Sequence, residues 1–167
     1  MHSRVLHNSR LDRTVTVRLL RKGDTNTVAA LFERLGPTSR KHRFHVSKPR
    51  LTPGELDALA QVDADHHVLV AYVDGDSLPV AMARVVRDAH NRSVGEIAFE
   101  VADAYQGCGI GTQLVELLLA DTRAAGIARI DAFVQTSNRA ALGLLRRTLG
   151  APLIRVDGAE KVVCSAV

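Results

Sequence analysis

The fold is decided by Gln106-Gly107-Cys108-Gly109-Ile110-Gly111-Thr112, which leads into an apolar, periodic segment. The alternating glycines let the backbone turn sharply and come close to a bulky ligand. Ile110, Leu114, Leu117 and Leu118 follow at helical spacing, which predicts a helix over 109–125 that ends at Gly126. Because the first turn of a helix has unbonded N–H groups and a positive dipole end, this segment predicts a pyrophosphate-binding loop.

The segments around this loop alternate between strand and helix patterns. Strands are predicted over 14–20, 67–73, 78–87, 94–102 and 128–134, and the pairs 152–156 and 161–166 form a closing hairpin. Helices are predicted over 24–35, 52–62 and 137–149. The fold class is therefore α/β of the mixed kind: a mixed, mostly antiparallel sheet with helices on both faces. The strand 94–102 should run parallel to 128–134.

Composition is that of one globular domain. The chain has 167 residues, 46% hydrophobic and 24% charged, and its net charge of +4 favours anionic partners. Residues 1–13 are interpreted as a flexible basic arm and 14–167 as a single domain. Cys108 and Cys164 match no metal or disulfide spacing, and no signal peptide or membrane-spanning run is present, so a cytoplasmic protein without a bound metal is expected.

Two motifs carry a family resemblance. No Lys follows the glycines as in a P-loop, and Thr112 breaks the Rossmann spacing. Gln106-x-x-Gly109-x-Gly111 instead resembles the Gln/Arg-x-x-Gly-x-Gly/Ala signature of the GNAT superfamily of acyl-CoA-dependent N-acyltransferases. The run 138–150, which begins with Asn138 and ends in Leu-Gly, is similar to the second cofactor motif of that family.

The resemblance implies a role for each matching residue, with acetyl-CoA as the co-substrate. Backbone amides would hold its pyrophosphate, and they belong to Gln106, Gly107, Cys108, Gly109, Ile110, Gly111 and Thr112. The backbone of Phe99 and Val101 would pair with the pantetheine arm, and Asn138 would bond the arm from the other side.

Within the superfamily, the sequence is most similar to bacterial Pat-type protein lysine acetyltransferases. The similarity rests on 32–35, on Ser39-Arg40 and Arg43-Phe44, and on the stretches 51–56 and 99–107. It implies acetyl transfer to an amine, with a protein lysine as the expected acceptor.

A lysine-type amine must lose a proton before it attacks a thioester, so a base is required. Glu96 and Glu100 lie four residues apart and share one face of the predicted strand. Glu96 matches the base glutamate of GNAT lysine acetyltransferases. It is the first candidate for the base, and Glu100 is the second candidate or a residue that binds the substrate cation. A backbone N–H near Val101 is the expected oxyanion donor.

Two positions depart from the family pattern. Leu145 stands where many members carry the Tyr that protonates the leaving thiolate, and Cys108 stands where Arg or Lys is common. Two alternatives stay open: an acetyltransferase of small amines, and a non-catalytic acetyl-CoA sensor or interaction module. The departures favour the sensor, and Glu96 argues against it. The basic stretch Arg40–Arg50 is a solvated loop, a contact for an acidic protein partner, or a contact for the CoA 3′-phosphate. Nucleic acid is a weaker alternative because aromatic residues are few. The group Asp63, Asp65, His66 and His67 fits no standard metal spacing.

Overall fold

The computed structural model describes residues 3–167 as one mixed sheet flanked by helices. Its eight strands are β1 (Arg4–Asn8), β2 (Arg13–Leu19), β3 (His66–Val73), β4 (Ala81–Arg87), β5 (Val94–Val101), β6 (Arg129–Gln135), β7 (Leu153–Asp157) and β8 (Glu160–Ala166). Its helices are α1 (Thr25–Phe32), α2 (Pro37–Phe44), α3 (Pro53–Leu59), α4 (Ile110–Ala124) and α5 (Arg139–Leu149), with a short 3-10 turn η1 (Asp103–Tyr105). The sheet order is β1-β2-β3-β4-β5-β6-β8-β7, and all pairs are antiparallel except β5–β6. The predicted fold class and the parallel pair are confirmed.

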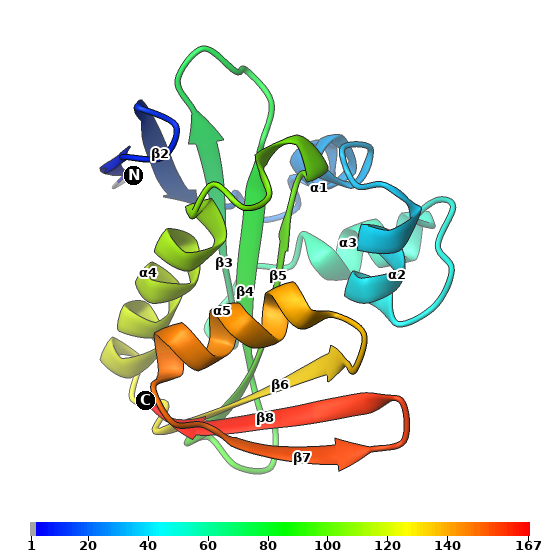
Figure 1. The fold of residues 1–167 in the computed structure, drawn as a ribbon, viewed down its shortest axis with the longest axis vertical. Coiled ribbons are helices and arrows are strands. Elements are labelled where there is room, and N and C mark those ends of the chain that lie inside the picture. Colours follow the sequence, from blue (N-terminus) through cyan, green and yellow to red (C-terminus); the bar gives the residue numbers. More distant parts are fainter. Residues whose placement is uncertain (1–2) are drawn as a thin grey trace.

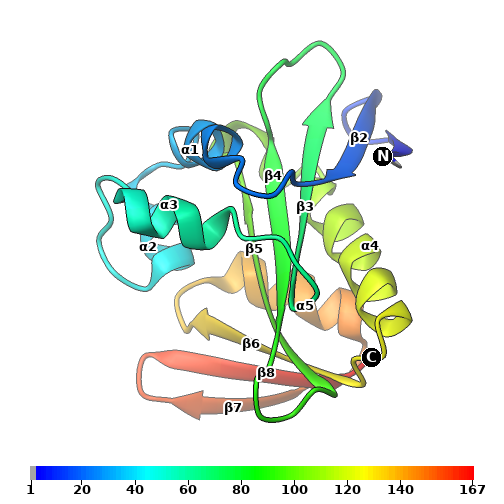
Figure 2. The same ribbon diagram turned by 180° about the vertical axis from the view of Figure 1, so that it is seen from behind.

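Helices cover both faces of the sheet. Figure 1 shows α4 and α5 in front of the strands, and Figure 2 shows α1 and α3 on the opposite face. Each face has its own apolar core. The α4 side buries Ile110, Leu114 and Leu118 against β3, β4 and β5, and the α1 side buries Leu31 with Met82.

The one parallel contact, between β5 and β6, is short. Only Val94, Gly95 and Glu96 pair with β6, opposite Arg129, Ile130 and Asp131. Beyond these pairs the two strands separate, while β4 remains paired with β5 as far as Val101. The sheet is therefore split at its centre, and the rest of β5 has a free edge on the β6 side.

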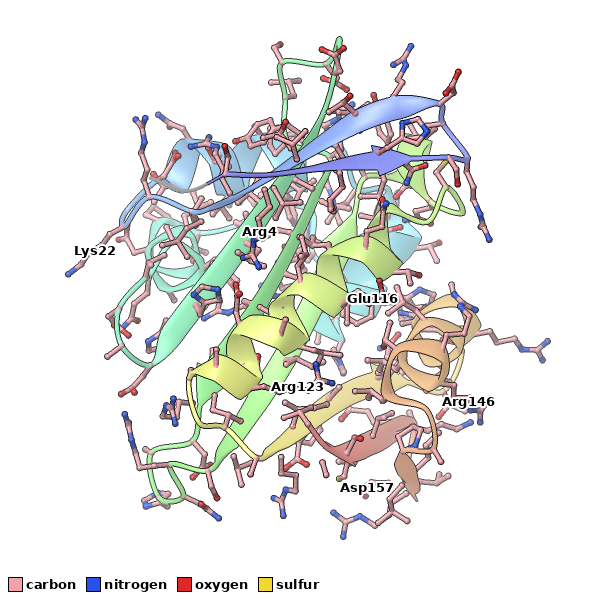
Figure 3. The ribbon with its side chains drawn as sticks, turned by 90° about the vertical axis from the view of Figure 1, so that its left-hand side faces the viewer. Arg4, Lys22, Glu116, Arg123, Arg146 and Asp157 are labelled. Carbon is pink, nitrogen blue, oxygen red and sulfur yellow. The ribbon has the colours of Figure 1, made fainter. Side chains whose placement is uncertain are left out.

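The flexible arm predicted over 1–13 is wrong for the part of it that the structure describes. Residues 4–8 form β1, which pairs with β2 at the edge of the sheet. Arg4 donates two hydrogen bonds to Asp121 of α4, at 2.8 and 2.5 Å, and His67 lies 2.8 Å from the same carboxylate. Figure 3 shows Arg4 extending from β1 toward α4. This ion pair attaches β1 to α4, although the two residues are 117 positions apart in the sequence.

A second difference is α2, for which no helix was predicted. Its sequence, Pro37-Thr-Ser-Arg-Lys-His-Arg-Phe44, has no buried residue and no apolar face to signal a helix. Tertiary contacts hold it: Arg40 stacks over Phe32 at 4.1 Å, and Arg43 pairs with Glu100 at 2.5 Å. The other predicted helices and strands are present, with ends that differ by a few residues.

No helix among residues 3–167 combines the length and the apolar character needed to cross a membrane. Within the same residues, no three His, Cys, Asp or Glu side chains gather in a way that could hold a metal ion. Asp63 is bonded to His66 at 2.8 Å and Asp65 pairs with Arg92 at 2.6 Å, so these side chains brace the turn before β3.

The free energy of unfolding depends on pH in acid because of Asp76. The Arg34 guanidinium at 2.7 Å, helped by the Leu78 amide and the Tyr105 hydroxyl, lowers the pKa of Asp76 to about 2. A carboxyl whose folded pKa is depressed contributes stability above its unfolded pKa, near 3.9, and loses it as the pH falls through the folded value. The contribution is about 1–2 kcal/mol after allowance for the remaining contact with water.

We therefore expect the free energy of unfolding of Asp76→Asn to be about 1–2 kcal/mol lower than that of the wild type at pH 7, and the difference to shrink between about pH 4 and pH 2. Urea unfolding of both proteins at several pH values measures it. A difference that stays constant across this range would show that the carboxylate charge is not the cause.

Candidate active site

The free edge of β5 forms one wall of a large cleft. The Ala102 N–H bonds to Val80 on the β4 side at 2.8 Å. Because successive residues of a strand point their N–H and C=O groups to opposite sides, those of Phe99 and Val101 point toward the gap between β5 and β6. The Val101 carbonyl accepts a hydrogen bond from the Gln106 side chain at 3.0 Å. The remaining groups of this edge are free to pair with an extended ligand.

The glycine loop lies at one end of the same cleft, which has a volume of about 940 Å³. Gly107 and Gly109 adopt positive φ angles of 74° and 86°, which non-glycine residues rarely adopt. The first bond that closes α4 runs from the Gln113 amide to the Gly109 carbonyl at 3.1 Å. The amides of Ile110, Gly111 and Thr112 precede it and lack acceptors within residues 3–167. This arrangement of donors at a helix N-terminus fits a pyrophosphate.

Gly111 allows the first turn of α4 to pack against both walls. A Cβ at this position would lie 3.0 Å from Leu144 Cδ1 on α5 and 3.2 Å from Val101 Cγ2 on β5. Any larger side chain must push one of these neighbours away. The third glycine therefore serves close packing, whereas the first two serve backbone conformation.

Asn138 lies across the cleft from the β5 edge. Its Oδ1 accepts the Ala141 amide at 3.1 Å and so caps α5, which explains the start of this helix. Its Nδ2 has no hydrogen-bond partner within residues 3–167 and belongs to a residue that lines the cleft. The side chain can therefore cap the helix and still offer a donor to a ligand.

The two candidate glutamates share a face of β5 but differ in environment. Glu96 is exposed, lines the cleft and lies where β5 and β6 begin to separate. Glu100 has only 10% of its side chain exposed and is bound by Arg43 at 2.5 Å. Glu96 is thus free to accept a proton, whereas Glu100 is already occupied by a cation.

Arg84 lies beside both carboxylates. It pairs with Ala98 on β5, so Glu96 and Glu100 are its diagonal neighbours on the same face. Its Nε is buried without a hydrogen-bond partner in residues 3–167. Burial, and then the nearby Arg43, lower the pKa of Arg84, while the two glutamates oppose this shift. A half-buried cation therefore lies next to the two carboxylates, on the same face of the sheet.

Helix α2 lines the cleft on the sheet face that carries Glu100, and it spans the gap between β5 and β6. Its Arg43 binds Glu100 of β5 on one side, and His42 lies 3.3 Å from Ser137 on the other. The C-cap residue His45 contacts Glu160 of β8 and accepts a bond from Gln135 of β6 at 3.3 Å. Much of the basic stretch predicted as either a solvated loop or a partner contact is thus engaged within the chain, since Arg40 and Lys48 are also bonded.

The structure shows the surroundings of Leu145 and Cys108, the two positions that depart from the family pattern. Leu145 lies on α5, is fully buried in the core and offers no proton. Cys108 is half-buried, and its thiol lies 3.6 Å from the Gln106 carbonyl. Residues that lie at the cleft and were not predicted for it include His42 on α2, and Asn8 and Arg10 beside the glycine loop. Only the unusual run of basic residues before 50 could have drawn attention to α2.

A split mixed sheet with a glycine loop at the N-terminus of the following helix defines a protein class that binds an extended, anionic ligand between two strands. Residues 28–151 match the acetyltransferase (GNAT) family model, which is most of the chain. The chain belongs to this family, whose members use acetyl-CoA.

Several relatives support the same assignment. The chain is 41% identical over 113 residues to acetyltransferase Pat of Mycolicibacterium smegmatis, a match that covers 67% of this chain and 33% of that protein. It is 28% identical over 131 residues to acetyltransferase PA5475 of Pseudomonas aeruginosa, which covers 77% and 70% of the two chains. The match thus spans about a third of the length of the first relative.

Among solved structures, the GNAT domain of S. lividans PAT matches with a TM-score of 0.88 at 23% identity, over 99% of this chain and 97% of that one. A cAMP-binding acyltransferase from Mycobacterium smegmatis matches with a TM-score of 0.69 at 29% identity, over 99% of this chain and 47% of that one.

The packing of Gly111 predicts the effect of enlarging it. We expect Gly111→Val to lower the free energy of unfolding by about 1–3 kcal/mol, because the added methyl groups overlap Leu144 and Val101. Chemical denaturation measures the change. Gly54→Val is the matched control, since a Cβ at Gly54 meets nothing within 4 Å. Equal stability of the two variants would contradict the close approach of α4 to β5.

Proposed function

We propose that this protein transfers the acetyl group of acetyl-CoA to the side-chain amine of a protein lysine, with Glu96 as the base. The observation that carries the proposal is the position of Glu96: an exposed carboxylate where β5 and β6 part, beside the free edge of β5 and on the cleft that holds the glycine loop. Membership of the GNAT family supports acetyl-CoA as the donor, which supplies an acetyl thioester.

The chain's own residues account for the proton that must leave the amine. A lysine ammonium has a reference pKa of about 10.4, so it is almost entirely protonated at neutral pH. The Glu96 carboxylate accepts one of its protons, directly or through a water molecule, and frees the nitrogen lone pair. The pair then forms the new C–N bond at the thioester carbonyl carbon, the C–S bond breaks with its electrons on sulfur, and the nitrogen gives its second surplus proton to water as the neutral amide forms.

Backbone groups of β5 assist at the carbonyl oxygen. The N–H of Val101 points into the split and can donate to this oxygen as negative charge develops on it. Leu145 cannot protonate the departing sulfur, so the group leaves as a thiolate or takes a proton from water. A free thiol has a pKa of about 8.5, which makes a thiolate an acceptable leaving group.

A protein acceptor is supported by similarity and by access. The chain resembles a protein named acetyltransferase Pat at 41% identity. Glu96 is exposed rather than enclosed, and Phe133, which lines the same cleft, leaves 44% of its surface open. A lysine that projects from a folded protein can therefore reach the base without the whole acceptor entering the cleft.

Binding and turnover are tested separately. A ligand that binds the native state raises the melting temperature, so acetyl-CoA should stabilise the protein. Thiol release is then followed with lysine-bearing proteins and with small amines such as polyamines. Release with proteins alone supports the proposal, release with small amines alone favours a small-molecule acetyltransferase, and stabilisation without any release favours a sensor. Absence of stabilisation at millimolar acetyl-CoA would refute the donor site.

For the base, we expect Glu96→Gln to reduce kcat by about 10²–10⁴-fold and to leave acetyl-CoA affinity unchanged, because the amide has the shape of the carboxylate but cannot take the proton. Steady-state kinetics and calorimetry measure the two effects. Glu116→Gln is the control, since this exposed glutamate on α4 is not among the residues that line the cleft (Figure 3). A larger loss in Glu100→Gln than in Glu96→Gln would transfer the role to Glu100.

A further inference from the structure

The turn between β1 and β2 rests on the glycine loop, although the two are about a hundred residues apart in the chain. Arg10 Nη1 donates a hydrogen bond to the Gly107 carbonyl at 2.9 Å. A Cβ built on Gly109 would lie 3.7 Å from Arg10 Cδ and 3.8 Å from Asn8 Nδ2. Asn8, Ser9 and Arg10 line the same cleft as the loop. The N-terminal hairpin therefore forms part of the wall around the α4 N-terminus.

Asn8 fixes this turn from within. It is only 2% exposed, and its Oδ1 accepts the amides of Arg10 at 3.2 Å and Leu11 at 3.0 Å. Its Nδ2 donates to Gln113 Oε1 at 2.8 Å, and Gln113 Nε2 donates back to the His7 carbonyl at 3.0 Å. A buried amide with its donors and acceptors engaged is rigid, so the turn is locked to the first turn of α4.

The loop itself brings no positive charge. The segment 106–113 consists of Gln, Gly, Cys, Gly, Ile, Gly, Thr and Gln, so it offers amides and the helix dipole only. Arg10 is exposed and uses one nitrogen for Gly107, while its Nε and Nη2 have no hydrogen-bond partner within residues 3–167. A guanidinium with a free side in this position matches the geometry of a phosphate oxygen pair.

The other arginines of the cleft are placed differently. Arg43 on α2 is ion-paired with Glu100 of β5. Arg139 and Arg147 line the cleft from α5. Among the cations of residues 3–167 that line the cleft, Arg10 is the one that is hydrogen-bonded to the glycine loop.

We propose that Arg10 binds the pyrophosphate of acetyl-CoA, and that Asn8 is the positioning residue that holds Arg10 over the loop. This inference rests on the proposed function, because it assumes that the cleft binds acetyl-CoA. The N-terminal hairpin thereby supplies the charge that the loop lacks, and the donor site is built from both ends of the sequence.

The test compares ligands that contain and lack the phosphates. Dissociation constants of acetyl-CoA, S-acetyl-dephospho-CoA and S-acetyl-pantetheine are measured by calorimetry for the wild type, Arg10→Ala and Arg10→Lys. We expect Arg10→Ala to weaken the first two ligands by about tenfold or more, as for a lost charge-assisted hydrogen bond, and to leave S-acetyl-pantetheine unchanged. Arg10→Lys should recover part of the loss, and affinity in Arg10→Ala should depend less on salt.

Controls separate this idea from others. Arg13→Ala removes an exposed cation of β2 that is not among the residues lining the cleft, and should bind like the wild type. Unchanged acetyl-CoA affinity in Arg10→Ala overturns the inference. So does a loss restricted to the ligand with the 3′-phosphate, or an equal loss for S-acetyl-pantetheine, which has no pyrophosphate to lose. A salt dependence of affinity in Arg10→Ala that equals that of the wild type also overturns it, because it would mean that Arg10 only braces the loop. If the wild type binds no acetyl-CoA, the proposed function fails instead.

Discussion

The parting of β5 and β6 after three paired residues is the constraint on which the rest of the structure depends. A strand in the middle of a sheet normally has both edges bonded, and buried backbone groups that lack partners are costly. Here the edge that carries Phe99 and Val101 is left open toward a cleft, so its N–H and C=O groups, apart from the Val101 carbonyl that Gln106 binds, are available to a ligand. Other elements follow from this opening. Helix α5 and its cap Asn138 form the far wall, and α2 bridges the gap through Arg43 and His45.

At the end of the cleft where the glycine loop lies, the backbone and the side chains supply different features. Two glycines with positive φ expose amides at the start of α4, and Gly111 lets that helix approach β5 and α5. Backbone donors fix the geometry, but they carry only partial charges. The β1–β2 turn, fastened by Asn8 to Gln113 and by Arg4 to Asp121, adds a full charge without lengthening the loop. A short, polar edge strand is therefore integral to the site.

Much of the fold could be predicted from local patterns, and the exceptions share a cause. The glycine loop, α4, α5 and the meander have strong periodicity or strong turn residues, so local sequence and final structure agree. Strand β1 and helix α2 lack such patterns: β1 is held by pairing with β2 and by Arg4, and α2 by Arg40 on Phe32 and by Arg43. Contacts between residues far apart in sequence leave no trace in local periodicity. The same limitation concealed Arg10.

The glutamates of β5 illustrate what the sequence could and could not separate. Their spacing placed both on one face, and similarity pointed to Glu96, but nothing local distinguished a free carboxylate from a paired one. The structure distinguishes them because α2 delivers Arg43 to Glu100 from 57 positions away in the chain. An ion pair with a nearly buried carboxylate is costly to break, since the remaining charge would lose its partner. Glu100 is therefore suited to hold α2 across the split. Glu96 has no ion-pair partner within residues 3–167, and it is the carboxylate that we propose as the base.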